Sequence, residues 1–306
     1  MKNLPRVLRI EPASKCNLSC IHCPTGTVAM DRGIMKDEVL DAIFDSIDES
    51  PNAVKVVVLY HGGEPLLNKK FFSFVELIRA KLPDAKIKTV TNGVALTKAN
   101  SEKVLKSSLD EIEVSLDGDS PYQNNLIRVG SDAAKIINNV HYLLELYKEY
   151  ARERLLRVSI ATTQFNPIDI SFGDNPPVPA WLLNEFKSSA VNFKTSNAYL
   201  WPDISMMENK STRENFEMIK DANGKKSSYC DHVNNTITVR ANGDVVPCCY
   251  DLTSKLVMGN VLDTSLLDIW NSENYNKLRD SIHNKKFISI CKTCAVVNPR
   301  INLVQR

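Results

Sequence analysis

The stretch CNLSCIHC, residues 16–23, places three cysteines within eight residues. It follows RVLRIEP (6–12), a short apolar run that predicts a β-strand, so the cysteines lie in the loop after that strand. A structural zinc site and an iron–sulfur cluster each usually take four protein ligands. Three cysteines on a tight loop would therefore leave one iron of a 4Fe–4S cluster without a protein ligand.

A zinc site is the alternative for this loop. Its fourth ligand would be His22, which lies between Cys20 and Cys23. Ligation by all three neighbours at once is strained, because so few residues separate them. The spacing favours the cluster and leaves the zinc site open.

Outward from this loop, short apolar runs alternate with amphipathic runs of helix length over the first two thirds of the chain. The predicted strands are 6–12, 53–60, 86–91, 111–116, 157–163 and 191–200. The predicted helices are 36–49, 68–82, 97–107, 131–154 and 178–190. Such alternation predicts an α/β fold of parallel βαβ units, and six strands predict a partial (β/α)6 barrel. The active site is then expected at the carboxyl ends of the strands.

The last third of the chain has a different pattern. Residues 203–228 are polar and predict a boundary with one short helix. TITVRANGDVVPC (236–248) predicts a β-hairpin around Asn242-Gly243, and 265–284 predicts one amphipathic helix with Thr264 as its N-cap. We therefore expect a barrel at 1–203, a linker at 204–228 and a small α+β domain at 229–306.

Composition excludes some classes of function. Among 306 residues, Lys and Arg number 38 and Asp and Glu 36, so the net charge of 38 − 36 = +2 gives no reason to expect binding to nucleic acid or an anionic membrane. We find no transmembrane-length apolar block and no signal peptide, so we expect a cytoplasmic protein. Cysteines there are usually reduced, which favours metal ligands over disulfides.

The other five cysteines all fall in the small domain. No cysteine lies between 23 and 230, so the sequence predicts two separate sulfur sites. The second group is Cys230, Cys248, Cys249, Cys291 and Cys294. Four of these could also form a structural zinc knuckle, which remains the alternative reading.

The stretch CNLSCIHC resembles the C-x3-C-x2-C signature of the radical S-adenosylmethionine (radical SAM) superfamily. The resemblance extends to GGEP (62–65), TNG (91–93) and SLDG (115–118), which follow the second, third and fourth predicted strands. It implies a 4Fe–4S cluster held by Cys16, Cys20 and Cys23, with SAM on the open iron. One-electron reduction then cleaves SAM to a 5′-deoxyadenosyl radical.

The resemblance also implies residues that bind SAM. They are Gly62, Gly63, Glu64, Pro65, Asn92, Ser115, Arg128 and His22. Glycines permit close backbone approach, Glu64 would accept from the methionyl ammonium, Arg128 would hold the carboxylate, and His22 would contact adenine. The alternatives are a solvated surface charge for Arg128, a rim histidine for His61 and a turn-former for Asp117.

The small domain resembles the SPASM/twitch extension of radical SAM enzymes. The matching parts are Cys230, NGDVVPC ending at Cys248, GNV (259–261), DIWNS (268–272) and CKTC (291–294). No cysteine follows Cys294, which implies the shorter twitch form with a single auxiliary 4Fe–4S cluster. Its ligands would be Cys230, Cys248, Cys291 and Cys294, with electron transfer or rigidity as its role.

Cys249 is left without a ligand role. Neighbouring side chains in an extended segment point to opposite faces, so Cys249 should face away from the cluster that Cys248 binds. It is either a small buried hydrophobe or, as in a radical epimerase, the donor of a hydrogen atom to a substrate radical.

These features lead to three hypotheses. The first is an enzyme that abstracts hydrogen from a carbinol carbon of a small sugar or aminocyclitol, giving epimerisation or oxidation to a ketone. The second is a peptide-modifying (RiPP maturation) enzyme, less expected because only fifteen residues precede Cys16. The third is a non-catalytic zinc protein. An enzyme would need a reductant such as flavodoxin or ferredoxin, and the long loop 164–181 is a candidate substrate lid.

Overall fold

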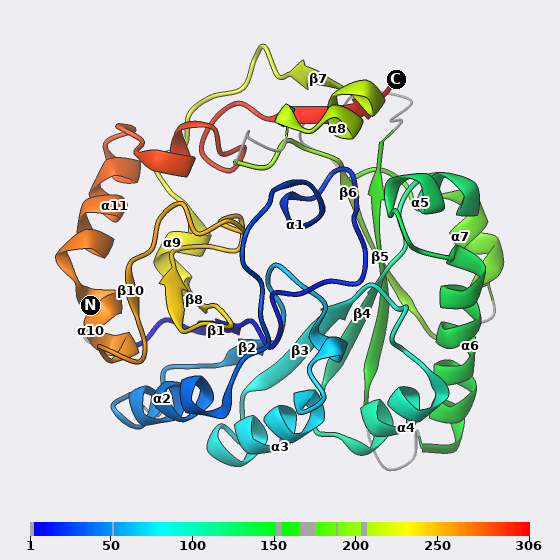
Figure 1. Ribbon diagram of the computed structural model, residues 1–306, viewed down its shortest axis with the longest axis horizontal. Coiled ribbons are helices and arrows are strands. Elements are labelled where there is room, and N and C mark those ends of the chain that lie inside the picture. Colours follow the sequence, from blue (N-terminus) through cyan, green and yellow to red (C-terminus); the bar gives the residue numbers. More distant parts are fainter. Residues whose placement is uncertain (1–2, 51, 151–154, 166–174, 188, 203–206) are drawn as a thin grey trace.

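The computed structural model describes residues 3–50, 52–150, 155–165, 175–187, 189–202 and 207–306. Half of the loop 164–181, the candidate lid, falls outside the described residues, at 166–174. Figure 1 shows a curved sheet around the middle of the molecule, with helices on its outer side. Within the described ranges, the larger sheet has nine strands in the order β10-β9-β8-β1-β2-β3-β4-β5-β6.

The six predicted strands are present and parallel, which confirms the partial barrel. They are β1 (Val7–Ile10), β2 (Val56–Val58), β3 (Lys86–Thr91), β4 (Glu111–Ser115), β5 (Arg157–Gln164) and β6 (Asn192–Asn197). The predicted helices are also present as α2 (Asp37–Asp48), α3 (Phe71–Lys81), α4 (Lys98–Lys106), α6 (Ala133–Tyr150) and α7 (Ala180–Glu185). Among the described residues of the barrel, the short α-helices α1 (Pro24–Thr27) and α5 (Pro121–Ile127) were not predicted.

The strands have one apolar and one polar face. Leu8, Ile87 and Ile112 are fully buried and belong to the core that the helices cover. Residues on the opposite face include Arg9, Lys88 and Glu113, which point into the barrel lumen because side chains alternate along a strand. Parallel strands are usually apolar on both faces. The polar lumen is therefore the feature that needs a functional explanation.

The small domain continues the barrel sheet. Strand β8 (Thr236–Val239) pairs parallel with β1, and β9 (Asp244–Val246) and β10 (Gly259–Asn260) follow antiparallel. This confirms the hairpin at Asn242-Gly243, where Gly243 has a φ of +89° that favours glycine. Helix α9 (Asp231–Asn235) precedes β8.

The prediction of one helix over 265–284 was wrong. The structure has α10 (Leu266–Asn271) and α11 (Glu273–His283), because Ser272 is extended and its side chain accepts from the Tyr275 amide, which starts a new helix. The N-cap of α10 is Ser265 rather than Thr264. The last short helix is η3 (Ser289–Lys292).

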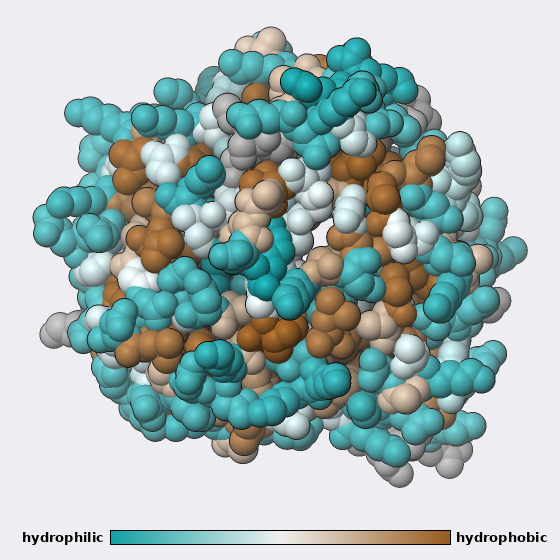
Figure 2. Space-filling view, viewed as in Figure 1, coloured by the Kyte–Doolittle hydropathy of each residue, from teal (hydrophilic) through white to brown (hydrophobic). Residues whose placement is uncertain are grey.

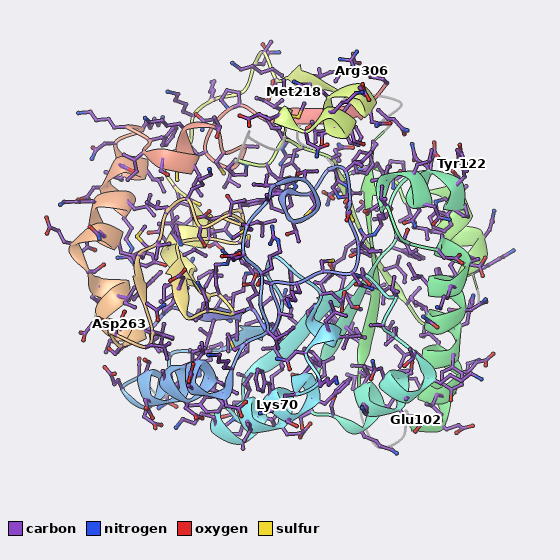
Figure 3. All side chains as sticks on the ribbon, in the orientation of Figure 1. Lys70, Glu102, Tyr122, Met218, Asp263 and Arg306 are labelled. Atoms are coloured by element: carbon purple, nitrogen blue, oxygen red, sulfur yellow. The ribbon has the colours of Figure 1, made fainter. Side chains whose placement is uncertain are left out.

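Residues 207–220 contain more structure than the sequence predicted. The expected short helix is α8 (Lys210–Asn215), and β7 (Phe216–Lys220) follows it directly. Strand β7 pairs antiparallel with β11 (Ile301–Gln305) at the C-terminus, so the chain end returns to the polar segment (Figure 1). Met218 on β7 lies on the outside of this ribbon (Figure 3).

The visible surface is mainly hydrophilic. Figure 2 shows polar side chains around the periphery and apolar side chains inside that rim, next to a hollow near the middle. Among the helices of the described ranges, none combines the length and the apolar character that crossing a membrane requires.

Candidate active site

The carboxyl ends of the first four strands meet at a pocket of about 190 Å³. Ten of the residues predicted to bind the barrel cluster or SAM line it: Cys16, Cys20, Cys23, His22, Gly62, Gly63, Glu64, Asn92, Ser115 and Arg128. Pro65 starts the short helix η1 (Pro65–Leu67) and is not among the lining residues. Tyr60, Trp201 and Leu252 also line the pocket, and the sequence did not indicate them.

The cysteine loop is held by backbone contacts. The amides of Ser19 and Ile21 donate to the carbonyls of Val129 and Ile127, at 2.9 and 3.0 Å. Helix α1 packs so closely that a Cβ on Gly26 would lie 2.6 Å from the Cys20 carbonyl oxygen. Glycine is therefore required at that position.

The thiols of this loop suit a metal cluster. Burial raises the pKa of Cys20 to about 12 and also raises the pKa of Cys16. Such thiols stay protonated until a cation compensates the thiolate charge, so metal binding and deprotonation are coupled. Asn92 Nδ2 lies 3.7 Å from Cys16 Sγ, which places a hydrogen-bond donor beside the sulfur.

Glu64 connects two strand ends. Its carboxylate accepts from the Leu66 amide at 3.0 Å, the Thr91 hydroxyl at 2.8 Å and the Asn92 amide at 2.7 Å. The side chain is buried, and burial raises the pKa of Glu64. Its position and charge suit an ammonium group in the pocket.

Arg128 is buried, so the alternative of a solvated surface charge was wrong. Its Nη1 donates to Asp117 Oδ2 at 2.6 Å, while Asp117 Oδ1 accepts from the Thr163 amide at 2.9 Å. Burial would lower the pKa of Arg128, but Asp117 raises it above the ordinary value. Asp117 thus orients Arg128 toward the pocket in addition to preceding Gly118 in the turn.

His22 contacts protein groups rather than a metal set. Its Nε2 lies 3.9 Å from Asp117 Oδ2, and its ring packs edge-on against Phe165 with centroids 5.1 Å apart. Burial lowers the pKa of His22 to about 4, so the ring is neutral at neutral pH. Among the described residues, no group of three or more His, Cys, Asp and Glu side chains is arranged to hold a metal ion. The geometry therefore favours neither the zinc site with His22 nor the cluster, and both stay predictions from the sequence.

His61 is a rim histidine, as the sequence interpretation had it. Its Nε2 lies 3.1 Å from the carbonyl oxygen of Asp251 in the small domain. The side chain is buried, and burial lowers the pKa of His61 to about 4. His61 thus joins the barrel rim to the segment that follows Cys249.

The four remaining predicted ligands come from distant elements of the small domain. Cys230 is the N-cap of α9, Cys248 follows β9, Cys291 lies in η3 and Cys294 lies just beyond η3. All four are buried and belong to the apolar core. Burial raises the pKa of each, to about 12 for Cys291 and about 11 for Cys294. Four thiols are the usual ligands of an iron–sulfur cluster, but among the described residues no three of these cysteines are arranged to hold a metal ion, so their shared cluster stays a prediction.

Cys249 has a different environment from Cys248. Cys248 is buried in the core, whereas Cys249 is partly exposed and its Sγ lies 3.6 Å from His232 Nδ1. Burial would raise the pKa of Cys249, but the contact with His232 lowers it. Cys249 is not among the residues lining the 190 Å³ pocket.

An aromatic cluster lies between Cys249 and the pocket. Its members are Tyr199, Trp201, His232 and Tyr250. Tyr199 donates to Tyr250 through their hydroxyls at 2.8 Å, and Trp201 lines the pocket. The sequence did not indicate this cluster; its one available signal was His232, two residues after Cys230.

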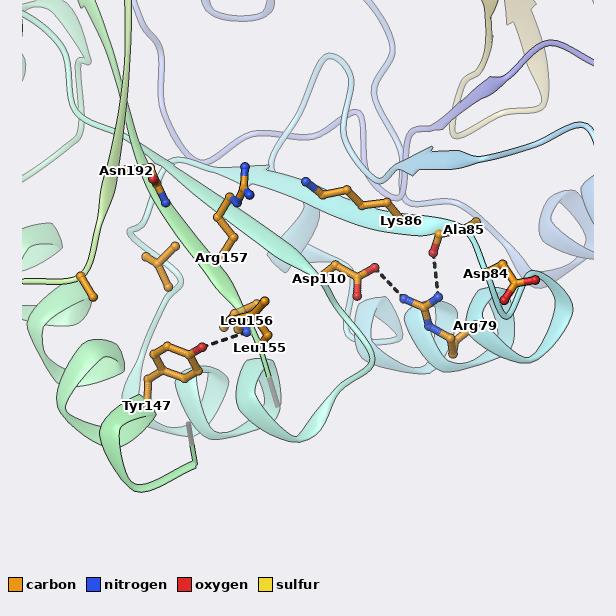
Figure 4. A pocket seen from close by; sticks show the side chains of 12 residues that line it. Arg79, Asp84, Ala85, Lys86, Asp110, Tyr147, Leu155, Leu156, Arg157 and Asn192 are labelled. Atoms are coloured by element: carbon orange, nitrogen blue, oxygen red, sulfur yellow. Dashed lines mark hydrogen bonds and ion pairs between the residues drawn. The ribbon is translucent and has the colours of Figure 1, made fainter. Parts of the chain in front are cut away.

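A larger cavity of about 680 Å³ lies at the opposite, amino ends of strands β3 to β6. Figure 4 shows Arg79 there, bonded to Asp110 and to the Ala85 carbonyl, and the Tyr147 hydroxyl accepting from the Leu156 amide. These groups satisfy one another, and no cysteine lines the cavity. We therefore place the active site at the smaller pocket.

Comparison with known proteins identifies the family of each part of the chain. Residues 10–155 match the Radical SAM superfamily, and residues 230–295 match SPASM, an iron–sulfur cluster-binding domain. An AdoMet-dependent heme synthase of Methanosarcina barkeri is 24% identical, with 96% of this chain and 91% of the relative covered.

Two solved structures share the fold. BtrN in complex with AdoMet and 2-DOIA has a TM-score of 0.59 at 19% identity, covering 96% of this chain and 94% of BtrN. Streptococcus suis SuiB bound to precursor peptide SuiA also has a TM-score of 0.59, at 18% identity, covering 90% of this chain and 67% of SuiB. These two structures show the fold alone. The matches to the two family models show that the chain belongs to the radical SAM superfamily, whose enzymes use a 4Fe–4S cluster with SAM, and that it carries a C-terminal SPASM domain, which binds auxiliary iron–sulfur clusters.

Proposed function

We propose that this enzyme abstracts hydrogen from a carbinol C–H of a small polyhydroxylated substrate, a sugar or an aminocyclitol. The observation that carries the proposal is the polar lumen directly beneath the pocket. Ser115 lines the pocket, and Glu113 and Lys194 form an ion pair on the lumen face below it. The hydroxyl groups of a substrate can form hydrogen bonds with these polar side chains of the lumen. An apolar substrate would instead remove water from the charged side chains without replacing its hydrogen bonds.

In this proposal Cys16, Cys20 and Cys23 hold one 4Fe–4S cluster, and Cys230, Cys248, Cys291 and Cys294 hold an auxiliary one. When bound, the first cluster supplies the electron that cleaves SAM to the 5′-deoxyadenosyl radical. Flavodoxin or ferredoxin is the proposed source of electrons.

The protein's own groups orient SAM. Glu64 accepts from the methionyl ammonium, and Arg128 donates to the carboxylate through its Nε, which has no partner among the described residues. Asn92 and Ser115 supply further hydrogen bonds, while Gly62 and Gly63 let the backbone approach. His22, neutral and held by Phe165, offers its ring to adenine.

Cys249 is the proposed hydrogen donor for epimerisation. Its S–H bond breaks as a C–H bond forms on the substrate radical from the face opposite to abstraction. The resulting thiyl takes up one electron from the reductant and one proton before the next turnover. The contact with His232 fixes the position of the sulfur. If Cys249 does not donate, the substrate radical would lose a proton and leave as a ketone, and the auxiliary cluster that Cys230, Cys248, Cys291 and Cys294 would hold would take up the electron.

Peptide modification is the second candidate. The structure of SuiB bound to SuiA shares the fold of this chain over 90% of its length. A peptide would need a groove leading from the pocket to the surface. A ketone or an epimer formed from a small substrate would argue against peptide modification. A cross-linked or oxidised peptide product would argue for it.

The test uses the reconstituted protein with SAM, reductant and candidate sugars or aminocyclitols in deuterated water, with mass spectrometry of the products. We expect the wild type to place deuterium at the inverted carbon. Cys249→Ala should still form 5′-deoxyadenosine but give no epimer. Cys248→Ala is the matched control, since it removes the neighbouring thiol and should disturb the auxiliary cluster instead.

Two results would contradict the Cys249 role: an epimer formed by Cys249→Ala, or a ketone as the wild-type product. A ketone would leave the carbinol abstraction in place and assign the enzyme to oxidation. No conversion of any polyhydroxylated compound, together with conversion of a peptide, would contradict the function as proposed.

A further inference from the structure

The barrel lumen carries an excess of positive charge. Seven charged side chains lie on the lumen face of β1 to β6: Arg9, Lys86, Lys88, Arg157 and Lys194 are basic, and Glu111 and Glu113 are acidic. Five cations and two carboxylates give 5 − 2 = +3. Strand register places Arg9, Lys88 and Glu111 in one row across the sheet, through Val58.

The two carboxylates are already paired. Lys194 contacts Glu111 at 2.6 Å and also pairs with Glu113, and Lys86 pairs with Glu111. Figure 4 shows Lys86 and Arg157 pointing toward each other at the amino end of the lumen. The carboxylates of the lumen face are therefore occupied by Lys86 and Lys194, at the side away from β1.

Arg9 and Lys88 have no such partner. Among the described residues, neither forms an ion pair with a carboxylate, and the Nε of Arg9 has no hydrogen-bond acceptor. Arg9 is only 7% exposed. Within the described part of the chain, Arg9 Nη1 makes one long hydrogen bond, to the Tyr60 carbonyl at 3.4 Å, and its guanidinium lies 4.7 Å from the centre of the Tyr60 ring. A buried cation without an anion is costly.

Both groups are next to the pocket. Tyr60 and Val90 line it. Arg9 lies on Tyr60, and Lys88 precedes Val90 by two residues on the same strand face, about 6.6 Å along the strand. A lysine side chain spans a similar length, so the Lys88 ammonium can reach the floor of the pocket. Burial lowers the pKa of Lys88, and repulsion by Lys194 and Arg9 lowers it further, while Glu111 and Glu113 act in the opposite direction.

From this arrangement we infer that Arg9 and Lys88 bind an anionic group of the substrate, a carboxylate or a phosphate. The inference rests on the proposed function and narrows its substrate class to sugar acids or sugar phosphates. A bound oxyanion would supply the missing acceptors and separate two like charges. A guanidinium and an ammonium together suit such a group, one as a planar fork and the other as a point charge.

The anchor would also position the reacting carbon. Arg9 lies on Tyr60, which lines the pocket, so a substrate whose anionic group binds Arg9 is held at that wall of the pocket. An aminocyclitol that carries only amines would be repelled at this point.

The test measures binding by calorimetry to the reconstituted protein with SAM but without reductant, so that nothing turns over. The probes are D-glucuronate, D-glucose 6-phosphate, inorganic phosphate, neutral D-glucose and cationic D-glucosamine. We expect at least one anion to bind at least tenfold more tightly than D-glucose, and D-glucosamine to bind most weakly. The two anionic sugars distinguish a carboxylate from a phosphate.

Lys88→Gln should remove most of this preference. Lys86→Gln removes the same charge from the distal end of the lumen, where Lys86 is paired, and should keep the preference. Arg9→Gln should remove the preference in the same way. A thermal melting curve shows whether the Arg9→Gln variant is folded. If it is not folded, Lys88→Gln alone tests the inference, because Lys88 is partly exposed.

If no anion binds more tightly than D-glucose, or if Lys88→Gln keeps the preference, the inference is wrong. Turnover separates the two proposals. A neutral polyol converted by Lys88→Gln with unchanged kcat/KM would contradict the anion site and leave the proposed reaction intact. Anion binding lost in Lys88→Gln, with no polyhydroxylated compound converted by the wild type, would contradict the reaction alone.

Discussion

The two groups of cysteines differ in what surrounds them. Cys16, Cys20 and Cys23 lie on one loop of eight residues, line a pocket and have the polar side chains of Glu64, Asn92 and Arg128 nearby. The four cysteines of the small domain come from elements up to 64 residues apart, 294 − 230, and all are buried within the apolar core.

The surroundings of each group of cysteines therefore indicate the role of the cluster that it would hold. A site that binds a substrate-like ligand must keep one side open and lined with hydrogen-bonding groups. A site that is closed by protein on every side can hold a cluster as part of the core, where it stabilises the fold. Removing the barrel cysteines should therefore mainly affect catalysis. Removing the cysteines of the small domain should mainly affect stability.

The largest expected effect is on catalysis. Replacing Cys16, Cys20 and Cys23 together by Ala should abolish 5′-deoxyadenosine formation, because the iron that binds SAM is lost. The protein should remain folded and retain about four irons per chain in the auxiliary cluster. Chromatography of reaction mixtures and iron analysis measure both. Undiminished SAM cleavage by the triple variant would refute the assignment.

The next effect is on stability. Replacing Cys291 and Cys294 by Ser should lower the unfolding free energy of the reconstituted protein by on the order of 4 kcal/mol, the linkage energy of a ligand at 1,000 times its Kd. Anaerobic urea denaturation measures it, with the triple barrel variant as the control, which should lose less. If the same substitutions lowered the unfolding free energy equally in the iron-free proteins, the effect would come from packing. That result would contradict the role of the cluster.

The smallest effect concerns one carboxylate of the open site. Glu64→Gln should weaken SAM binding by about 1.5–3 kcal/mol, the range for hydrogen bonds to charged groups. Because burial raises the pKa of Glu64, wild-type affinity should fall as the pH drops through that raised pKa, since the protonated carboxyl no longer attracts the ammonium. The variant should lack this pH dependence.

Glu273→Gln is the control for this measurement. Glu273 is an exposed carboxylate on α11 of the small domain, paired with Lys277. SAM affinity in this variant should equal that of the wild type at every pH. If Glu64→Gln behaved in the same way, Glu64 would have no part in the site.

The barrel and its pocket could be predicted because the signals are local. Each strand is one apolar run, and the four motifs fall directly after consecutive strands, so parallel topology alone brings their residues together. Arg128 was less predictable. Its ion pair with Asp117 depends on how α5 turns the chain back, and α5 is a seven-residue helix without a strong apolar face.

Long-range partners were not predictable from the sequence. Strand β7 is mostly exposed and becomes a strand only because β11, about 80 residues later, pairs with it. The contact of His232 with Cys249 depends on how α9 is placed against the end of the hairpin. The lumen charges did have a signal: Arg9 and Lys88 are basic residues at alternating positions within otherwise strand-like runs, where an apolar residue would be ordinary.

The pairing of β8 with β1 has a consequence for shortened forms of the enzyme. Every residue of β1 has a register partner in β8, so β1 is an interior strand only while the small domain is attached. A chain cut before Cys230 would expose the full edge of β1, with unpaired amides and carbonyls that recruit strands from other molecules. The radical-forming barrel would then tend to aggregate rather than persist as a minimal enzyme. The iron–sulfur domain thus covers the edge of the catalytic sheet and prevents it from pairing with strands of other molecules.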